Sequence, residues 1–156
     1  AIFIIIQFFR IDKTNPAINL ADDFIEIAKP SEEIAVLLKS ACYDCHSYQS
    51  EYPWYSNIAP VSWWVKDHID EGRDELNFSK WSTYSVKKKD HKLEEMVEEL
   101  EEGEMPLKPY PLTHAESRLS DSQREQLVAW VTTFRKKTKE KKTKPTLHLN
   151  NGEKCP

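Results

Sequence analysis

Two thiols and an imidazole stand close together in the run Cys42-Tyr43-Asp44-Cys45-His46. In a Cys-x-x-Cys-His run the two sulfurs add to the vinyl groups of a haem as thioethers, and the adjacent imidazole ligates the iron. Two intervening residues allow one helical turn to present both sulfurs to one edge of the porphyrin, with His46 beneath the metal. The run therefore predicts one covalently attached haem c, held by Cys42, Cys45 and His46.

Two other chemistries use a Cys-x-x-Cys pair. A zinc site needs a second pair of Cys or His at ligand spacing. The remaining histidines and the third cysteine are instead scattered singly: His68, His91, His114, His148 and Cys155. A thioredoxin-like dithiol follows a strand of a βαβ unit, whereas residues 34–41 carry a helical pattern. Haem attachment is therefore the favoured interpretation, with zinc or thiol chemistry as the alternative.

Met105 is the predicted ligand on the opposite face of the haem. It lies in the run Gly103-Glu104-Met105-Pro106-Leu107, directly after a predicted helix. A thioether is a soft, neutral ligand, and Met/His ligation raises the reduction potential of a haem. Pro106 restricts the backbone of Met105 to extended conformations, which favours one orientation of the sulfur. His46 and Met105 are thus the predicted metal ligands.

Other residues compete for this sixth position. Met96 lies on the apolar stripe of a predicted helix and is interpreted as a core residue. Among the histidines, His68 lies beside two tryptophans, His114 is within reach of the Met105 segment, and His91 follows a lysine run and is expected in solvent. A bis-histidine iron and an open or weakly ligated iron are therefore the alternatives to Met105.

The composition limits the fold classes that the chain can adopt. The chain of 156 residues is long enough for one domain with a buried core. Its charged fraction of 31% and its three glycines favour helices over a turn-rich β fold. The net charge of −4 offers no basic footprint, so no nucleic acid is predicted as a partner.

Four amphipathic helices are predicted, with apolar residues recurring at i, i+3, i+4 and i+7. The first begins at Ser31, a capping residue, and leads directly into Cys42. The other three are expected over residues 60–72, 85–102 and 120–135. This order, with a Met-Pro segment before the last helix, resembles the class I cytochromes c, in which the first and last helices cross beside the haem. The sequence therefore predicts an all-α, class I cytochrome c-like domain around one haem.

The ends of the chain differ from this domain. Residues 1–11 begin with the apolar run AIFIIIQFF and are interpreted as a hydrophobic membrane anchor or signal remnant. Nine residues, apolar apart from Gln7, are too few to cross a bilayer, which takes about twenty apolar positions. This run is therefore expected to be the end of a longer segment, with a buried strand as the alternative. Residues 12–30 are interpreted as a tether, 31–135 as the haem domain and 136–156 as a basic, polar, disordered tail.

Aromatic and acidic residues bear on the surroundings of the haem. Most of the five tryptophans are expected to serve both as core and as apolar walls of the haem pocket, with simple core packing as the alternative: Trp54, Trp63, Trp64, Trp81 and Trp130. Seven glutamates lie within residues 94–104, next to the predicted ligand segment. Such an acidic face can steer a basic redox partner, although a simply solvated helix face is the commoner interpretation.

Several segments together resemble a known family. The runs CYDCHSYQSEYPWY, IAPVSWWVKDHIDEG, LNFSKW and GEMPLKPY are similar to those of the bacterial haem-binding domain family, over roughly residues 2–134. This family consists of small single-haem proteins with an N-terminal hydrophobic anchor. The resemblance implies a monohaem c-type protein on the outer side of the inner membrane, with Cys42, Cys45 and His46 on the attachment motif and Met105 on the Gly-Glu-Met-Pro segment.

These observations lead to one predicted function and two alternatives. The chain is predicted to be a single-electron carrier in the bacterial periplasm, anchored to the inner membrane and working with redox partner proteins, for example within a respiratory complex. A haem-based sensor or small-ligand-binding protein with an open distal face is the alternative. A peroxidase-like enzyme ranks last, because no spacing indicates a distal base. The Met-Pro segment favours the electron carrier over both.

Overall fold

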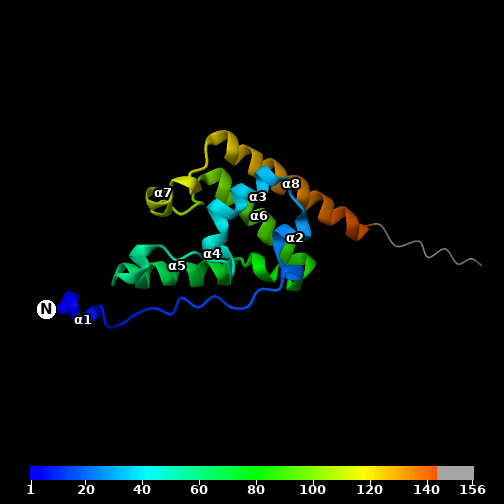
Figure 1. Cartoon of the computed structure of the whole chain (residues 1–156). Helices are drawn as coiled ribbons and strands as arrows, with labels where there is room; N and C mark the ends of the chain where they lie inside the picture. The colour runs from blue at the N-terminus through cyan, green and yellow to red at the C-terminus, as the bar shows by residue number, and fades with distance from the viewer. Residues whose placement is uncertain (144–156) are drawn as a thin grey trace, which may run out of the picture.

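Figure 1 shows helices wrapped around a central core, with an extended N-terminal segment along one side. The structure, a computed structural model, describes residues 1–143 and the side chains of residues 1–140. Every regular element in these residues is helical and none is a strand, so the predicted all-α class is confirmed. The elements are α1 (Ile2–Ile6), η1 (Leu20–Asp22), α2 (Phe24–Ala28), α3 (Glu32–Leu38), η2 (Lys39–Tyr43), α4 (Asp44–His46), η3 (Trp54–Asn57), α5 (Val61–Glu75), η4 (Phe78–Thr83), α6 (Val86–Glu102), α7 (Tyr110–Thr113), η5 (Ala115–Ser117) and α8 (Asp121–Thr143).

Short polar side chains begin the main helices, as their positions in the sequence predict. The Ser31 hydroxyl accepts a hydrogen bond from the Ile34 amide at 3.4 Å and begins α3. Ser85 caps α6 in the same way, and Gly103 ends that helix with a left-handed φ of 74°. Each cap satisfies an amide that the helix itself leaves without a partner. These two helix starts and the end of α6 agree with the sequence analysis.

The core lies where α3, α6 and α8 meet. α6 packs along α8, and α3 packs against α8. The fully buried side chains include Leu38 from α3, Leu93 from α6, and Leu127 and Val131 from α8. Their spacing along each helix places them on one face, which is the physical reason that the apolar pattern predicted these helices. The Arg135 guanidinium joins the two long helices through the Asp90 carboxylate at 2.7 Å.

The domain begins earlier than predicted. Residues 12–30 were assigned to a tether, but they include η1 and α2, and the Phe24 ring is fully buried among core aromatics. The Tyr43 hydroxyl also donates to the Asp23 carboxylate at 3.0 Å. The tether assignment is therefore wrong for the second half of this segment, because Phe24 and Asp23 contribute to the core and to the motif.

The last helix ends later than predicted. α8 continues to Thr143, although the sequence analysis ended it at Arg135 and began a disordered tail at residue 136. Lys139 lies 3.0 Å from the Asp90 carboxylate, so charged contacts with α6 continue beyond the apolar pattern. The remainder of the predicted tail, with His148 and Cys155, lies outside the described residues.

The N-terminal segment forms a short helix and an extended chain. α1 spans only five residues, and its large apolar side chains are mostly exposed. The alternative of a buried strand is therefore wrong. Within residues 1–143, no helix is both long and apolar enough to span a bilayer.

Candidate haem site

The Cys42–His46 motif lies in a helical rod that changes its pitch. α3 continues without a break into η2, which is a π-helical stretch, and then into α4. Single π-helical turns are rare and occur frequently at functional sites. Cys42 and His46 are four positions apart, so their side chains lie on the same side of the rod. Both side chains line one cavity.

Two backbone carbonyls hold the His46 ring. Its Nδ1 lies 2.8 Å from the carbonyl oxygen of Gly72 and 3.0 Å from that of Leu76. Because a carbonyl oxygen only accepts, Nδ1 carries the proton and Nε2 carries a free lone pair. Desolvation lowers the pKa of His46, since the charged ring is poorly solvated at this depth. His46 is therefore a neutral, oriented imidazole, which is the form that binds metals.

Gly72 allows α5 to approach the motif closely. A Cβ atom at this position would lie 3.0 Å from the carbonyl oxygen of Cys45 and 3.3 Å from its Cβ. The sequence analysis ended the second long helix at Gly72, and this is wrong, because α5 continues to Glu75. The glycine is needed for close packing rather than for ending the helix, and this packing brings the Gly72 carbonyl to His46.

A cavity of about 260 Å³ opens beside the motif. Its walls come from the motif, the end of α5, the start of η4, the outer half of α6 and the segment after α6. The lining side chains are Ala41, Cys42, His46, Glu75, Leu76, Phe78, Lys92, Glu95, Met96, Glu99, Leu100 and Met105. Aliphatic and aromatic walls with sulfur and imidazole donors match the requirements of a haem, which needs an apolar pocket and axial ligands.

Met105 lines the same cavity as His46. Its amide donates to the Glu99 carbonyl at 3.3 Å, and its own carbonyl accepts from Arg124 Nη1 at 2.8 Å. Arg124 Nη1 also donates to the Leu100 carbonyl at 2.8 Å. One guanidinium thus fastens both the end of α6 and the Met105 segment to α8. The structure brings together Cys42, His46 and Met105, which are 63 positions apart at most along the chain.

Met96 also lines the cavity, which the sequence analysis missed. It lies on α6 and packs against the hydrophobic core, as predicted, but its side chain faces the cavity as well. Met96 and Glu99 are three positions apart and Leu100 is four away, so the three share one helix face. The apolar spacing of α6 identified this face, and only the position of the motif shows that part of it borders a pocket.

Cys45 is the one residue of the predicted attachment pair that does not line the cavity. Its backbone lies against Gly72 of α5. Burial raises the pKa of the Cys42 thiol to about 12 and that of Cys45 to about 11. Thiols with raised pKa values are poor nucleophiles for disulfide exchange. Within residues 1–143 no group of three or more His, Cys, Asp or Glu side chains is arranged to hold a metal ion, so a zinc site finds no further ligands there.

The described histidines other than His46 lie outside the cavity. The His68 Nδ1 donates to the Trp64 carbonyl at 2.8 Å, and the His68 ring packs on the Trp64 indole. His91 is exposed and lies 3.1 Å from the Glu95 carboxylate. His114 stacks on Tyr110 and contacts the Tyr55 hydroxyl at 2.8 Å. Each ring is occupied by neighbours away from His46, so the geometry favours Met105 over these three.

The tryptophans do not form the walls of the cavity. Trp81 is buried in the core, with Trp130 packed against it, whereas the indole of Trp54 is 75% exposed. The expectation that the tryptophans serve as walls of the haem pocket is therefore wrong for all five. Phe78 fills this role instead, and its ring also stacks on Tyr43 of the motif. The sequence contains no signal that distinguishes Phe78 from an ordinary core residue.

Charged side chains border one side of the cavity. Lys92 Nζ lies 3.1 Å from the Glu75 carboxylate and 2.7 Å from that of Glu95, and only 12% of its side chain is exposed. Glu99 lines the same side. Part of the acidic run at residues 94–104 therefore borders the pocket, as its place in the sequence predicted, while Lys92 neutralises some of this charge.

Comparison with known proteins gives one match. No curated protein and no solved structure matches the chain. The model of the haem-binding domain family matches residues 1–133, which include the whole cavity and the motif. A largely apolar cavity lined by the neutral, oriented His46 and by the methionine side chains of Met96 and Met105 is consistent with this match. The chain belongs to the haem-binding domain family.

Proposed function

We propose that this protein is a monohaem c-type cytochrome that carries single electrons. The observation that supports this most is that one cavity is lined by Cys42, His46 and Met105, three residues that the sequence singles out for haem attachment and ligation. When bound, the haem supplies a reversible Fe(III)/Fe(II) couple. An electron carrier needs no substrate site, so the protein is not expected to be an enzyme.

Each residue has a distinct task in this proposal. Cys42 and Cys45 hold the haem through thioether bonds, which makes the attachment permanent. His46 would ligate the iron through Nε2, because Nδ1 donates to the carbonyls of Gly72 in α5 and of Leu76 directly after it. Met105 would supply its thioether sulfur as the second protein ligand. Two permanent protein ligands would limit the rearrangement that accompanies each electron transfer.

The walls of the cavity support a raised reduction potential. Leu76, Phe78 and Leu100 exclude water, and a low dielectric disfavours the extra charge of the ferric state. The carboxylates of Glu75 and Glu95 act in the opposite direction, since negative charge stabilises the ferric iron. Lys92 neutralises part of this effect through its contacts with both carboxylates. A methionine ligand and apolar walls together favour a potential above that of bis-histidine haems.

The proposal extends to location and partners. Haem c is attached outside the cytoplasmic membrane in bacteria, so we place the protein in the periplasm, held at the inner membrane by its apolar N-terminal segment. Its partners are then other redox proteins, including subunits of a respiratory complex. The glutamates beside the cavity suit a partner with a basic surface, and their attraction should weaken with salt.

Visible spectra test the ligation directly. The oxidised and reduced protein should give low-spin spectra with a weak far-red band from methionine-to-iron ligation, and carbon monoxide should not bind the reduced form. A high-spin spectrum, or ready carbon monoxide binding, would instead support a haem sensor with an open distal face. Retention of the haem after acid-acetone extraction tests the covalent attachment, and Cys42→Ala with Cys45→Ala should abolish it.

A pair of methionine variants tests which sulfur ligates. Met105→Ala should abolish the far-red band and allow carbon monoxide to bind. Met96 lines the same cavity, so Met96→Ala serves as the matched control. This variant should keep the far-red band while lowering the free energy of unfolding by about 2 kcal/mol. The proposal for Met105 fails if the band survives in Met105→Ala and disappears in Met96→Ala.

A further inference from the structure

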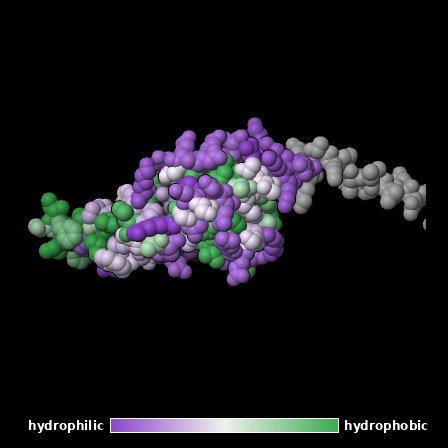
Figure 2. Space-filling model, turned by 90° about the horizontal axis from the view of Figure 1, so that it is seen from above, coloured by the Kyte–Doolittle hydropathy of each residue, from purple (hydrophilic) through white to green (hydrophobic). Residues whose placement is uncertain are grey.

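One side chain in the wall of the haem cavity can bind an anion. Among the described residues that line this cavity, Lys92 is the single lysine or arginine, and only 12% of its side chain is exposed. Figure 2 shows hydrophilic residues over much of the face that it displays, so a charged side chain in solvent indicates no particular role. A lysine that is largely withdrawn from solvent is uncommon, because a desolvated charge needs partners. The place of Lys92 in the cavity wall therefore points to a specific role.

Two carboxylates hold the Lys92 ammonium in this wall. Its Nζ donates to the Glu75 carboxylate at 3.1 Å and lies 2.7 Å from the Glu95 carboxylate. Burial alone would favour the neutral amine, but hydrogen bonds to Glu95 and Glu75 outweigh it and raise the pKa of Lys92 above its ordinary value. The group is therefore an ammonium with three N–H donors, of which two have partners among the described residues. The third donor is left for a further acceptor.

The charge and the position of Lys92 make it unsuitable as a ligand of the iron. An ammonium has no lone pair to give to a metal. Lys92 and Glu99 are seven positions apart on α6, which corresponds to about 10 Å along the helix axis. The Met105 amide donates to the Glu99 carbonyl, so the Met105 segment joins this wall at the Glu99 end. Lys92 therefore lies about two helical turns from that end, beside Glu75 at the end of α5.

A haem would bring anions of its own into this cavity. It carries propionate carboxylates on the side of the porphyrin opposite the vinyl groups, and the proposed thioether bonds place the vinyl groups at the motif. The described lining already contains three carboxylates, those of Glu75, Glu95 and Glu99. Like charges repel strongly where apolar walls lower the local dielectric constant. A propionate among these carboxylates is therefore favourable only beside a cation, and Lys92 is the cation that the lining offers.

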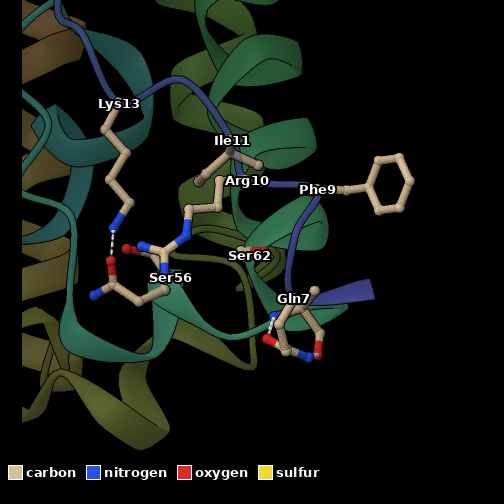
Figure 3. A pocket seen from close by; sticks show the side chains of 9 residues that line it. Gln7, Phe9, Arg10, Ile11, Lys13, Ser56 and Ser62 are labelled. Carbon is tan, nitrogen blue, oxygen red and sulfur yellow. Dashed lines mark hydrogen bonds between the residues drawn. The ribbon is translucent and has the colours of Figure 1, made fainter. Parts of the chain in front are cut away.

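Other cations of the described chain are less suited to this task. Arg124 and Arg73 donate to backbone carbonyls and do not line the haem cavity. Arg10 and Lys13 line a second cavity, of about 240 Å³, beside the N-terminal segment, and Figure 3 shows their side chains there. Neither the Cys42–His46 motif nor Met105 contributes to that second cavity. These cations are therefore not placed to bind an anion that shares a cavity with His46.

We propose that Lys92 binds a propionate carboxylate of the haem through its third N–H and so determines how the porphyrin is oriented in the cavity. The motif then holds the vinyl side of the ring and Lys92 holds the propionate side. The positive charge also disfavours the ferric state, which raises the reduction potential. This inference rests on the proposed function, because it takes haem as the occupant of the cavity, and it assigns Lys92 a direct contact with that haem.

Resonance Raman spectra of the full-length haem-loaded protein test the contact. They contain a bending band of the propionate groups, whose frequency changes with the hydrogen bonds that these groups accept. Lys92→Met should shift this band from its wild-type position, and Lys92→Arg, which keeps a cation, should restore most of the shift. Lys108→Met is the matched control, because Lys108 also pairs with a glutamate, Glu104 at 3.1 Å, but does not line the cavity. This control should leave the band at its wild-type position.

Redox titration of the same proteins gives a second readout. Loss of the ammonium in Lys92→Met should shift the Fe(III)/Fe(II) equilibrium about tenfold toward the ferric state, which corresponds to a fall of about 59 mV for a one-electron couple. Lys92→Arg should stay within about twofold of wild type. Lys108→Met should do the same, because the Lys108 side chain is 74% exposed and its charge is screened by solvent. Lys92→Gln, which keeps a polar group in the wall, should change both readouts in the same direction as Lys92→Met.

The outcomes separate this inference from the proposed function. A propionate band at its wild-type position in Lys92→Met would overturn the contact, even if the reduction potential fell, because the charge would then act without touching the haem. An equal shift of the band in Lys108→Met would also overturn it. The low-spin spectrum and the far-red band should be the same in every variant, since they report on His46 and Met105. A wild-type protein without attached haem would overturn the proposed function and this inference together.

Discussion

The two sides of the haem cavity are built differently. On the His46 side, a continuous helical rod carries the ring, and its Nδ1 donates to the carbonyls of Gly72 in α5 and of Leu76 directly after it. Gly72 also allows the backbone of α5 to pack directly on that of the motif. On the other side, Met105 lies in a segment between helices. Its backbone is held by a hydrogen bond from its amide to the Glu99 carbonyl at 3.3 Å and by one from Arg124 to its carbonyl. The first side consists of regular structure, whereas the second depends on a single side chain from another helix.

The two sides of the cavity differ in how strongly they constrain their side chains. The His46 ring is oriented before any ligand is present, so it loses little conformational entropy when it binds a metal. The Met105 segment has fewer constraints, and Met96 lies in the same cavity with a second flexible thioether. Under the proposed ligation, the His46 side would determine where the haem lies, and the Met105 side would determine how firmly the remaining iron position is occupied.

The largest effect is expected from closing the space at Gly72. Gly72→Val would push side-chain atoms into the Cys45 backbone, and overpacking of this kind should lower the free energy of unfolding by about 3 kcal/mol. The same change should displace the Gly72 carbonyl from His46 and reduce the fraction of protein with attached haem. Denaturant unfolding and the haem-to-protein absorbance ratio measure the two effects.

Gly103→Val is the matched control on the other side. A Cβ atom at Gly103 meets no atom within 4 Å, but its φ of 74° is unfavourable for a β-branched residue and should cost about 2 kcal/mol. This variant should attach haem normally. If both variants attach haem equally well, the close packing of α5 on the motif is not what positions His46.

A smaller effect is expected from loosening the Met105 side of the cavity. Arg124→Met removes both hydrogen bonds to the carbonyls of Leu100 and Met105, and the loss should be about 1.5 kcal/mol. More specifically, the Met105 segment should loosen, so the far-red band should weaken and carbon monoxide should bind faster than in wild type. The His46 side should be unaffected, and haem attachment should stay complete.

Arg118→Met provides the control for this prediction. Arg118 is exposed and also donates to a backbone carbonyl, that of Pro111, at 2.7 Å. It lies away from the cavity, so its loss should leave the far-red band and the carbon monoxide kinetics as in wild type. A band that is equally strong in Arg124→Met would mean that the Met105 segment is held by its own contacts alone.

The sequence predicted the parts of this fold that follow from local patterns. The caps at Ser31 and Ser85 and the stop at Gly103 use short-range chemistry that is visible in the sequence. The motif at residues 42–46 and the Met-Pro run each indicate a chemical role without any three-dimensional information. Their meeting in one cavity was an inference from their roles, and the structure brings them together there.

The missed features all depend on contacts between distant segments. Gly72 has the sequence signature of a helix end, and only the packing of Cys45 against it explains why the helix continues. Phe78 and Met96 border the cavity because of how η4 and α6 pack on the motif, and their own local patterns do not show this. The same holds for Phe24, which lies in the segment that the sequence analysis assigned to a tether, although its ring is fully buried in the core.

The smallest effect concerns the contact of the two long helices that support the Met105 side. Hydrogen bonding to the Arg135 guanidinium lowers the pKa of Asp90 from 3.8 to about 2. A carboxyl group with a lowered pKa in the folded state stabilises the protein above the pKa of the unfolded state, and this contribution disappears as the pH falls from about 4 to about 2. Because Asp90 is partly exposed and screened, we expect only about 0.5 kcal/mol from it at neutral pH.

Asp90→Asn should therefore lower the free energy of unfolding by that amount at pH 7 and by almost nothing near pH 2, where wild type and variant converge. Urea unfolding at several pH values measures this convergence. Asp67→Asn changes an exposed carboxylate on α5. In this variant the free energy of unfolding should change between pH 7 and pH 2 by the same amount as in wild type. The far-red band should be the same in all three proteins, because the contact joins α6 to α8 without touching the cavity. A weaker band in Asp90→Asn would mean that the α6–α8 contact, and not Arg124 alone, determines how firmly Met105 is held.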